Sequence, residues 1–113
     1  MTELIRLASV QMVSTPRVQD NLLALDRLVR GAAADGAQLG VVPEFLPMIG
    51  ATDEARLAIR ELPGDGPLQE FLSGLAKELG IWLIGGSIPM AGSDPVRAMN
   101  STLVFDPEGK QIS

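Results

Sequence analysis

Residues 39–50 read Leu-Gly-Val-Val-Pro-Glu-Phe-Leu-Pro-Met-Ile-Gly, and they give the clearest indication of the fold class. Its first four residues are apolar and too few for a helix, so they predict a short strand that is buried on both faces. Strands of this kind occur in parallel sheets, because helical crossovers cover both faces of such a sheet. The segments around residues 39–42 should therefore supply helices and further parallel strands.

The segment that precedes this strand predicts a strand and then a helix. Residues 4–11 are typical of a strand, and apolar residues then recur at alternating spacings of four and three, as on one face of a helix. These residues are Val18, Leu22, Leu25, Val29 and Ala32. Thr15 and Pro16 suit a helix start, and Asp35 with Gly36 suits its end. With residues 39–42, this order makes a βαβ unit.

A second helix is predicted after the turn at residues 62–67 and a weak helical segment near residues 53–59. Its apolar stripe consists of Leu68, Phe71, Leu72, Leu75, Ala76 and Leu79. Glu70, Ser73 and Lys77 lie on the opposite side, and Gly80 ends the helix. We expect Phe71, Leu72 and Leu75 to be buried against the sheet.

Two more strands follow this helix. Residues 81–84 predict a buried strand that Gly85-Gly86-Ser87 breaks, and residues 100–105 predict another strand before a turn at residues 106–109. The turn requires a partner strand, but only Lys110 to Ser113 come after it, so we expect the domain to continue beyond residue 113. The element order, βαβ-αβ-β, places residues 1–113 in one α/β domain.

Composition excludes several kinds of chemistry. The chain has 113 residues, 9 basic and 14 acidic side chains and a formal charge of −5, with no Cys and no His. Disulfides, Cys-ligated or His-ligated metals and Ser-His or Cys-His nucleophile pairs are therefore excluded within these residues. We expect no metal, no cofactor, no nucleic-acid partner and no membrane partner. Because residues 1–6 lack an apolar signal region, we expect a cytoplasmic location.

Glu44 is the strongest candidate for a catalytic residue. It is the one charged residue in the apolar segment 41–49, and it follows a predicted buried strand at the end where open α/β sheets place their sites. Burial would raise the pKa of this carboxyl toward the range that a general base needs. The residues alone leave open a second interpretation, in which Glu44 is a loop residue that points into solvent.

Other motifs have simpler explanations. Gly64-Asp65-Gly66 and Gly85-Gly86 lack the third glycine and the position of a dinucleotide-binding loop, so turns and close backbone packing explain them better. No histidine is available to activate a serine, and Asp53-Glu54 has no further acidic residue at ligand spacing. Asn100, at a strand start, could enter a buried hydrogen-bond network or have no special role.

The order of five motifs resembles the nitrilase superfamily of carbon–nitrogen hydrolases. These motifs are Ala8 to Met12, Asn21-Leu22, Gly36 to Gln38 leading into Val42-Pro43-Glu44-Phe45, Gly80 to Ser87, and Asn100-Ser101 leading to Phe105-Asp106-Pro107 with Gly109. Together they cover nearly the whole chain. Within the superfamily, residues 43–50, 64–67 and 80–89 are most similar to the branch that contains deaminated-glutathione amidase.

The resemblance implies the N-terminal half of an αββα sandwich and a Glu-Lys-Cys catalytic set. In that set a Cys attacks an amide or nitrile carbon, a Glu acts as general base, and a Lys stabilises the oxyanion. Glu44 matches the base, whereas the matching Lys and Cys would lie beyond Ser113. The resemblance thus favours the functional interpretation of Glu44, a small-molecule amide or nitrile substrate, and a homo-oligomer for the complete enzyme.

Two other classes of function stay open at this point. One is a non-catalytic fragment or pseudoenzyme subunit that acts as an interaction module. The other is a small nucleotide-binding α/β domain, which the missing phosphate loop disfavours. The sequence that follows Ser113 in the gene would separate an enzyme from an interaction module.

Overall fold

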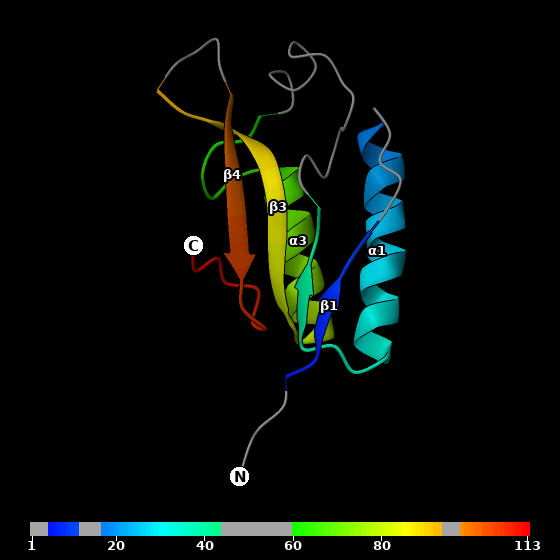
Figure 1. The fold of residues 1–113 in the computed structure, drawn as a ribbon. Helices are drawn as coiled ribbons and strands as arrows, with labels where there is room; N and C mark the ends of the chain where they lie inside the picture. Colours follow the sequence, from blue (N-terminus) through cyan, green and yellow to red (C-terminus); the bar gives the residue numbers. More distant parts are fainter. Residues whose placement is uncertain (1–4, 12–16, 44–59, 94–97) are drawn as a thin grey trace.

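The computed structural model describes residues 5–11, 17–43, 60–93 and 98–113. This part of the chain forms one sheet with two helices (Figure 1). The elements in chain order are β1 (Leu7–Ser9), α1 (Val18–Ala34), β2 (Leu39–Val41), α3 (Pro67–Leu79), β3 (Trp82–Ala91) and β4 (Ala98–Phe105). The order matches the βαβ-αβ-β order that the sequence predicts.

The strands form a mixed sheet in the order β1-β2-β3-β4. The first three strands are parallel, and β4 runs antiparallel to β3. Register partners cross the sheet in straight rows, with Leu39 between Leu7 and Trp82 and with Val41 between Ser9 and Ile84. The carboxyl ends of β1 and β2 consequently lie at the same edge of the sheet.

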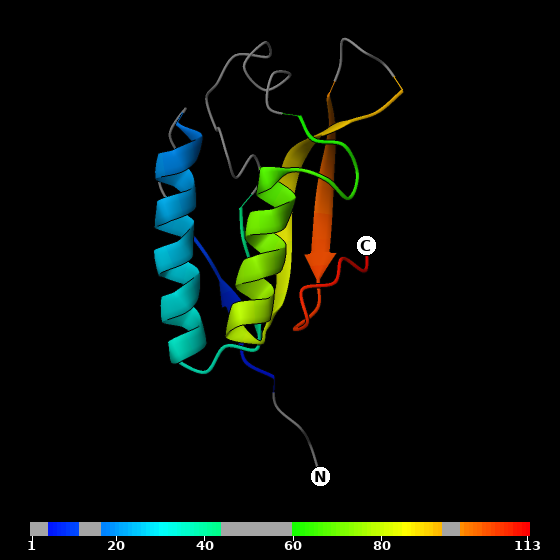
Figure 2. The same ribbon diagram turned by 180° about the vertical axis from the view of Figure 1, so that it is seen from behind.

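Both helices lie on the same side of the sheet, as the view from behind shows (Figure 2). The hydrophobic core fills the space between this helix layer and the sheet. Its most completely buried side chains include Leu25 and Val29 of α1, Leu72 of α3, Leu83 of β3 and Phe105 of β4. The apolar spacings in the sequence predicted the helix residues of this set.

The ends of α3 follow from the residues at its two boundaries. Pro67 occupies the first turn, where its missing N–H costs nothing, and Gly80 ends the helix in the left-handed conformation at φ 65°. The buried face includes Leu68, Leu72 and Leu75, whereas Phe71 is only half-buried. The prediction for Leu72 and Leu75 is confirmed, and full burial of Phe71 was wrong, because this ring lies toward the groove between the helices.

The predicted break at Gly85-Gly86-Ser87 is wrong. β3 continues through these residues to Ala91, and its pairing with β4 shifts register between Gly85 and Ile88, as at a β-bulge. Glycine is needed at position 85 because a Cβ there would lie 2.8 Å from Leu72 Cδ1. Gly85 therefore lets helix α3 approach the strand and does not end the strand.

The chain folds back after β4. Gly109 N donates to Asp106 O in the turn, and Phe105 pairs with Gln111 in an antiparallel bridge. Ile112 N donates to Val104 O, so residues 110–113 lie along β4. This pairing confirms the predicted turn at residues 106–109.

Several predictions fall outside the described residues. These are the helix start at Thr15 and Pro16, the weak helix near residues 53–59, Asp53-Glu54, and the segment 44–50. β1 is described from Leu7 to Ser9, within the wider strand predicted over residues 4–11. In the described part of the chain, neither helix has the length and apolar character needed to cross a membrane.

Candidate functional site

The carboxyl end of β2 is held between its two neighbouring strands. Val42 N donates to Ile84 O of β3 at 3.0 Å, and Val10 N donates to Val41 O at 2.9 Å. The Val42 side chain is buried in the core. The backbone is thus fixed up to the point where Pro43 leads out of the sheet, which is the edge where α/β proteins place their ligands.

Glu44 follows Pro43 directly and lies outside the described residues. The contacts of Val42 with β3 fix the point from which the chain continues to Pro43 and Glu44. The β-bulge of β3 starts at Gly85, one residue beyond the Ile84 carbonyl that binds Val42 N. Bulges are frequent beside active sites, because they change the direction of a strand locally.

Glu61 pairs with β3 in a parallel bridge at Met90. Glu61 N donates to Pro89 O at 3.1 Å, and Ala91 N donates to Glu61 O at 2.7 Å. Val42 and Glu61 are therefore both hydrogen-bonded to β3, Val42 before the bulge at Ile84 and Glu61 after it at Pro89.

The side chain of Glu61 is a buried carboxylate that binds the start of helix α3. Only 5% of Glu61 is exposed. Its carboxylate accepts hydrogen bonds from Leu68 N at 2.6 Å and from Gln69 N and Gln69 Nε2, both at 3.1 Å. These donors include backbone N–H groups that would otherwise be unpaired at the positive end of the helix.

Gln69 completes this network around the turn before α3. Its Nε2 also donates to Leu62 O at 2.7 Å and to Asp65 O at 3.2 Å, while its Oε1 accepts from Gly64 N at 2.8 Å. With three donors bound to it, the Glu61 carboxylate holds the turn and the start of the helix together.

The sequence analysis did not identify Glu61 or Gln69. The sequence does contain an indication of this role. Glu61 stands immediately before the turn Leu62 to Pro67, and Gly66 comes directly before the proline that begins the helix. A carboxylate there can reach the free N–H groups of the first helical turn.

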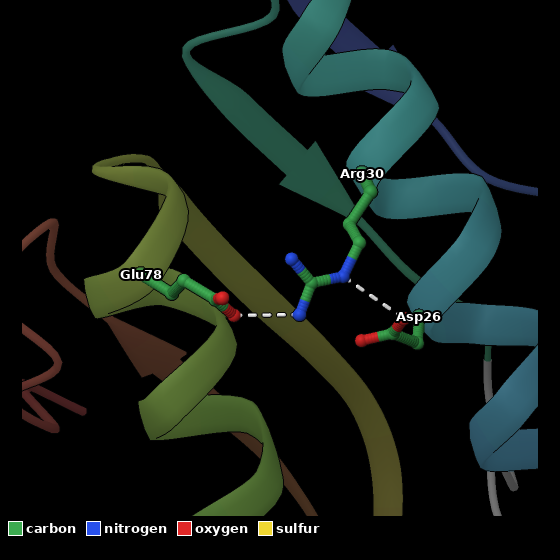
Figure 3. Close-up of polar contacts among 3 residues, drawn as sticks. All are labelled: Asp26, Arg30 and Glu78. Atoms are coloured by element: carbon green, nitrogen blue, oxygen red, sulfur yellow. Dashed lines mark hydrogen bonds and ion pairs between the residues drawn. The ribbon is translucent and has the colours of Figure 1, made fainter.

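Charged side chains also join the two helices on the side that faces away from the sheet (Figure 3). Arg30 of α1 binds Glu78 of α3 at 2.6 Å and Asp26 of its own helix at 2.9 Å. The hydrogen bonds with Glu78 and then Asp26 raise the pKa of the Arg30 guanidinium above its ordinary value. This cluster is a link between helices and lies away from the end of β2.

The two lysines do not approach the candidate site. Lys77 is exposed on α3. The backbone of Lys110 is hydrogen-bonded to Asp106, which directly follows Phe105. Because Phe105 pairs with Leu83 near the start of β3, Lys110 lies toward the amino end of β3. Among residues 5–11, 17–43, 60–93 and 98–113, no three acidic residues gather closely enough to hold a metal ion.

Comparison with known proteins identifies the relatives of this chain. Residues 6–113 match the family model described as carbon-nitrogen hydrolase. The chain is 40% identical to an omega-amidase NIT2-A of Xenopus laevis over 105 residues, and 36% identical to the omega-amidase NIT2 of Homo sapiens over 109 residues. These matches cover 92% and 96% of the chain but only 36% and 38% of the relatives. The chain thus spans little more than a third of their length.

The fold is also found in solved structures. The chain superposes on Saccharomyces cerevisiae Nit3, described as a member of branch 10 of the nitrilase superfamily, with a TM-score of 0.84 and 28% identity. This match covers 96% of the chain and 42% of Nit3. The described sheet and helices are the N-terminal half of a nitrilase-type αββα sandwich, as the sequence analysis expects.

Proposed function

Because this chain belongs to the carbon-nitrogen hydrolase family, we propose that it forms the N-terminal part of an amidase in which Glu44 is the general base. The position of Glu44 carries the proposal. It comes two residues after Val42, whose backbone N–H is fixed to Ile84 O, at the edge of the sheet where family and fold both favour a catalytic site.

The proposed reaction is hydrolysis of an amide to an acid and ammonia. Glu44 takes the proton of a Cys thiol as its sulfur attacks the amide carbon, and a Lys stabilises the oxyanion. The nitrogen leaves as ammonia, protonated through the same carboxyl group, and water then releases the acid from the thioester. In this proposal, the Cys and the Lys come from the part of the protein that follows residue 113.

The relatives named omega-amidase favour a small ω-amide as substrate. We extend this substrate class to the complete protein, with nitriles as the alternative that the family chemistry allows. The proposal also includes a cytoplasmic location and a homo-oligomer for the complete enzyme. Glu61 is given a structural role in this proposal, because its carboxylate binds the start of helix α3.

A chimaera tests the proposal. Residues 1–113 are joined to the remainder of the Xenopus laevis omega-amidase NIT2-A, which supplies the part that this chain does not match. We expect the chimaera to release ammonia from an ω-amide and to form a thioester that mass spectrometry detects on its Cys. A folded chimaera that binds the amide and gives neither product would contradict the proposal.

A second candidate function is an interaction module without catalysis. One observation favours it, because the 113 residues contain no Cys and so cannot form the thioester by themselves. Sequencing of the gene downstream of the codon for Ser113 separates the two candidates. A downstream Lys and Cys in strands favour the enzyme, and an immediate stop codon favours the module.

A further inference from the structure

Arg60 carries a guanidinium nitrogen that is buried and that has no hydrogen-bond partner in the described part of the chain. This atom is Nη1, whereas the residue as a whole is only partly buried. A buried donor without a partner costs free energy, because it has given up its hydrogen bonds with water. Such groups are rare in folded proteins, so a charged one requires an explanation. A bound anion supplies one.

The backbone next to Arg60 is fixed to the carboxyl end of β3. Glu61 N donates to Pro89 O, and Ala91 N donates to Glu61 O, as between parallel strands. β3 extends well past Ile84, the last of its residues that pairs with β2, and Glu61 lies beside this extension (Figure 1). Arg60 therefore belongs to the end of the sheet at which α/β proteins place their ligands.

The side chains of Arg60 and Glu61 leave this backbone on opposite sides. Successive side chains of an extended segment alternate between the two faces of a sheet. The Glu61 carboxylate faces the helix layer, because it accepts hydrogen bonds from Leu68 N and Gln69 N of α3. The Arg60 side chain is thereby directed to the other face of the sheet, which is the inner face of the αββα sandwich.

Arg60 is the one described cation in this position. The other described basic residues lie on or directly before a helix, before β1 or after β4, and they are Arg6, Arg17, Arg27, Arg30, Lys77 and Lys110. A guanidinium is charged at every working pH and binds a carboxylate through two parallel N–H···O bonds. Arg60 is thus equipped to bind a carboxylate at this end of the sheet.

We infer that Arg60 binds the carboxylate of an amide substrate and selects ω-amides that carry a free carboxyl group at their other end. This inference rests on the proposed function, because it concerns the same site. Glu44 would act at the amide end of the substrate, and Arg60 holds the acidic end. The substrate carboxylate accepts the hydrogen bond of Nη1, which has no other partner in the described chain. Arg60 is a binding residue in this assignment and does not touch the reacting atoms.

Two amides of the same chain length test the assignment in the chimaera with the Xenopus laevis omega-amidase NIT2-A. Succinamate carries a carboxylate at the end opposite its amide, and butyramide carries a methyl group there. Arg60→Gln should raise KM for succinamate about 10- to 100-fold, the loss expected for hydrogen bonds to a charged group. The kcat for succinamate and both constants for butyramide should stay the same, because the lost contact is equally strong in the bound and transition states.

Two further variants separate binding from a structural effect. Arg60→Lys keeps the positive charge and loses the paired geometry, so its KM for succinamate should lie between those of the native chimaera and Arg60→Gln. It also keeps the test valid if Arg60→Gln does not fold. The matched control is Arg27→Gln, because Arg27 is exposed on α1 in the helix layer, and this variant should leave KM for both amides unchanged.

The outcomes distinguish this inference from the proposed function. Ammonia release from butyramide reports the amidase chemistry, whereas the change in KM between the two amides reports Arg60. If neither amide is hydrolysed, the proposed function fails, and calorimetric titration with succinate still tests whether Arg60→Gln weakens carboxylate binding by the same factor. An unchanged KM for succinamate in Arg60→Gln, an equal rise for both amides, or succinate binding that Arg60→Gln leaves intact would overturn the inference.

Discussion

The carboxylate of Glu61 occupies the space that any side chain at position 66 would need. A Cβ on Gly66 would lie 2.3 Å from Glu61 Cδ and 2.3 Å from Glu61 Oε1. Gly66 also adopts φ 155°, a conformation that L residues with a side chain rarely reach. The glycine before helix α3 and the carboxylate that binds the start of that helix are therefore one structural unit.

Gly66→Ala should destabilise the chain by about 2 kcal/mol or more, because backbone strain and the contact with Glu61 add together. Gly74→Ala, inside helix α3, is the matched control. A Cβ at Gly74 meets no atom within 4 Å, so this substitution should stabilise the helix by about 0.5 to 1 kcal/mol. Urea unfolding measures both changes, and a Gly66→Ala variant as stable as the native chain would disprove the contact.

Glu61→Ala should cost about 2 to 4 kcal/mol of unfolding free energy. The substitution leaves Leu68 N, Gln69 N and Gln69 Nε2 without the carboxylate that they bind, in a buried position. Glu108→Ala, at an exposed position in the turn after β4, should change stability by less than about 0.5 kcal/mol. Equal effects of the two substitutions would mean that Glu61 does not hold the helix.

Leu75→Ala should destabilise the chain by roughly 2 to 5 kcal/mol, since Leu75 is 3% exposed and packs in the core. Its control is Leu23→Ala on α1, where the side chain is mostly exposed and the expected loss is below about 0.5 kcal/mol. Thermal and urea unfolding give the two values. If Leu75→Ala unfolds with the native midpoint, α3 packs through a different face.

Arg30→Gln should shift the unfolding midpoint little, because the side chains of Arg30, Asp26 and Glu78 are all partly exposed and water screens their attraction. The pKa of Arg30 is raised in the folded state, so its contribution is complete below the unfolded pKa and is lost only as pH rises through the folded value. The pH values at which this contribution would be lost therefore lie above those of ordinary unfolding experiments. Unfolding scans between about pH 6 and 9 should therefore show the same Arg30→Gln effect throughout, and an effect that grows with pH would contradict this explanation.

The sequence predicted the elements whose signals are local. The spacing of Leu25 and Val29 placed α1, and Pro67 and Gly80 bounded α3, because apolar periodicity and helix ends depend on residues a few positions apart. The turn after Phe105 was likewise predictable from its residue types. The sandwich fold was predictable only from the order of motifs along the whole chain, which resembles that of a known family.

The features that sequence analysis missed depend on contacts between distant elements. Gly85 and Gly86 predicted a strand break, but packing of Leu72 against Gly85 and pairing with β4 keep the strand continuous. The role of Glu61 requires its pairing with β3 and its approach to Leu68 N at once, which no short pattern encodes. For Glu44, the strand that leads to it was predicted and is confirmed, while its catalytic role stays a prediction.

The most direct test of the central claim is the turnover number of the Glu44→Gln chimaera. Gln keeps the size of the side chain and removes its ability to take a proton, so kcat for the ω-amide should fall about 10² to 10⁴-fold with KM nearly unchanged. Glu108→Gln in the same chimaera is the control and should keep native kcat. A Glu44→Gln chimaera with kcat close to that of Glu108→Gln would contradict the assignment of Glu44 as the general base.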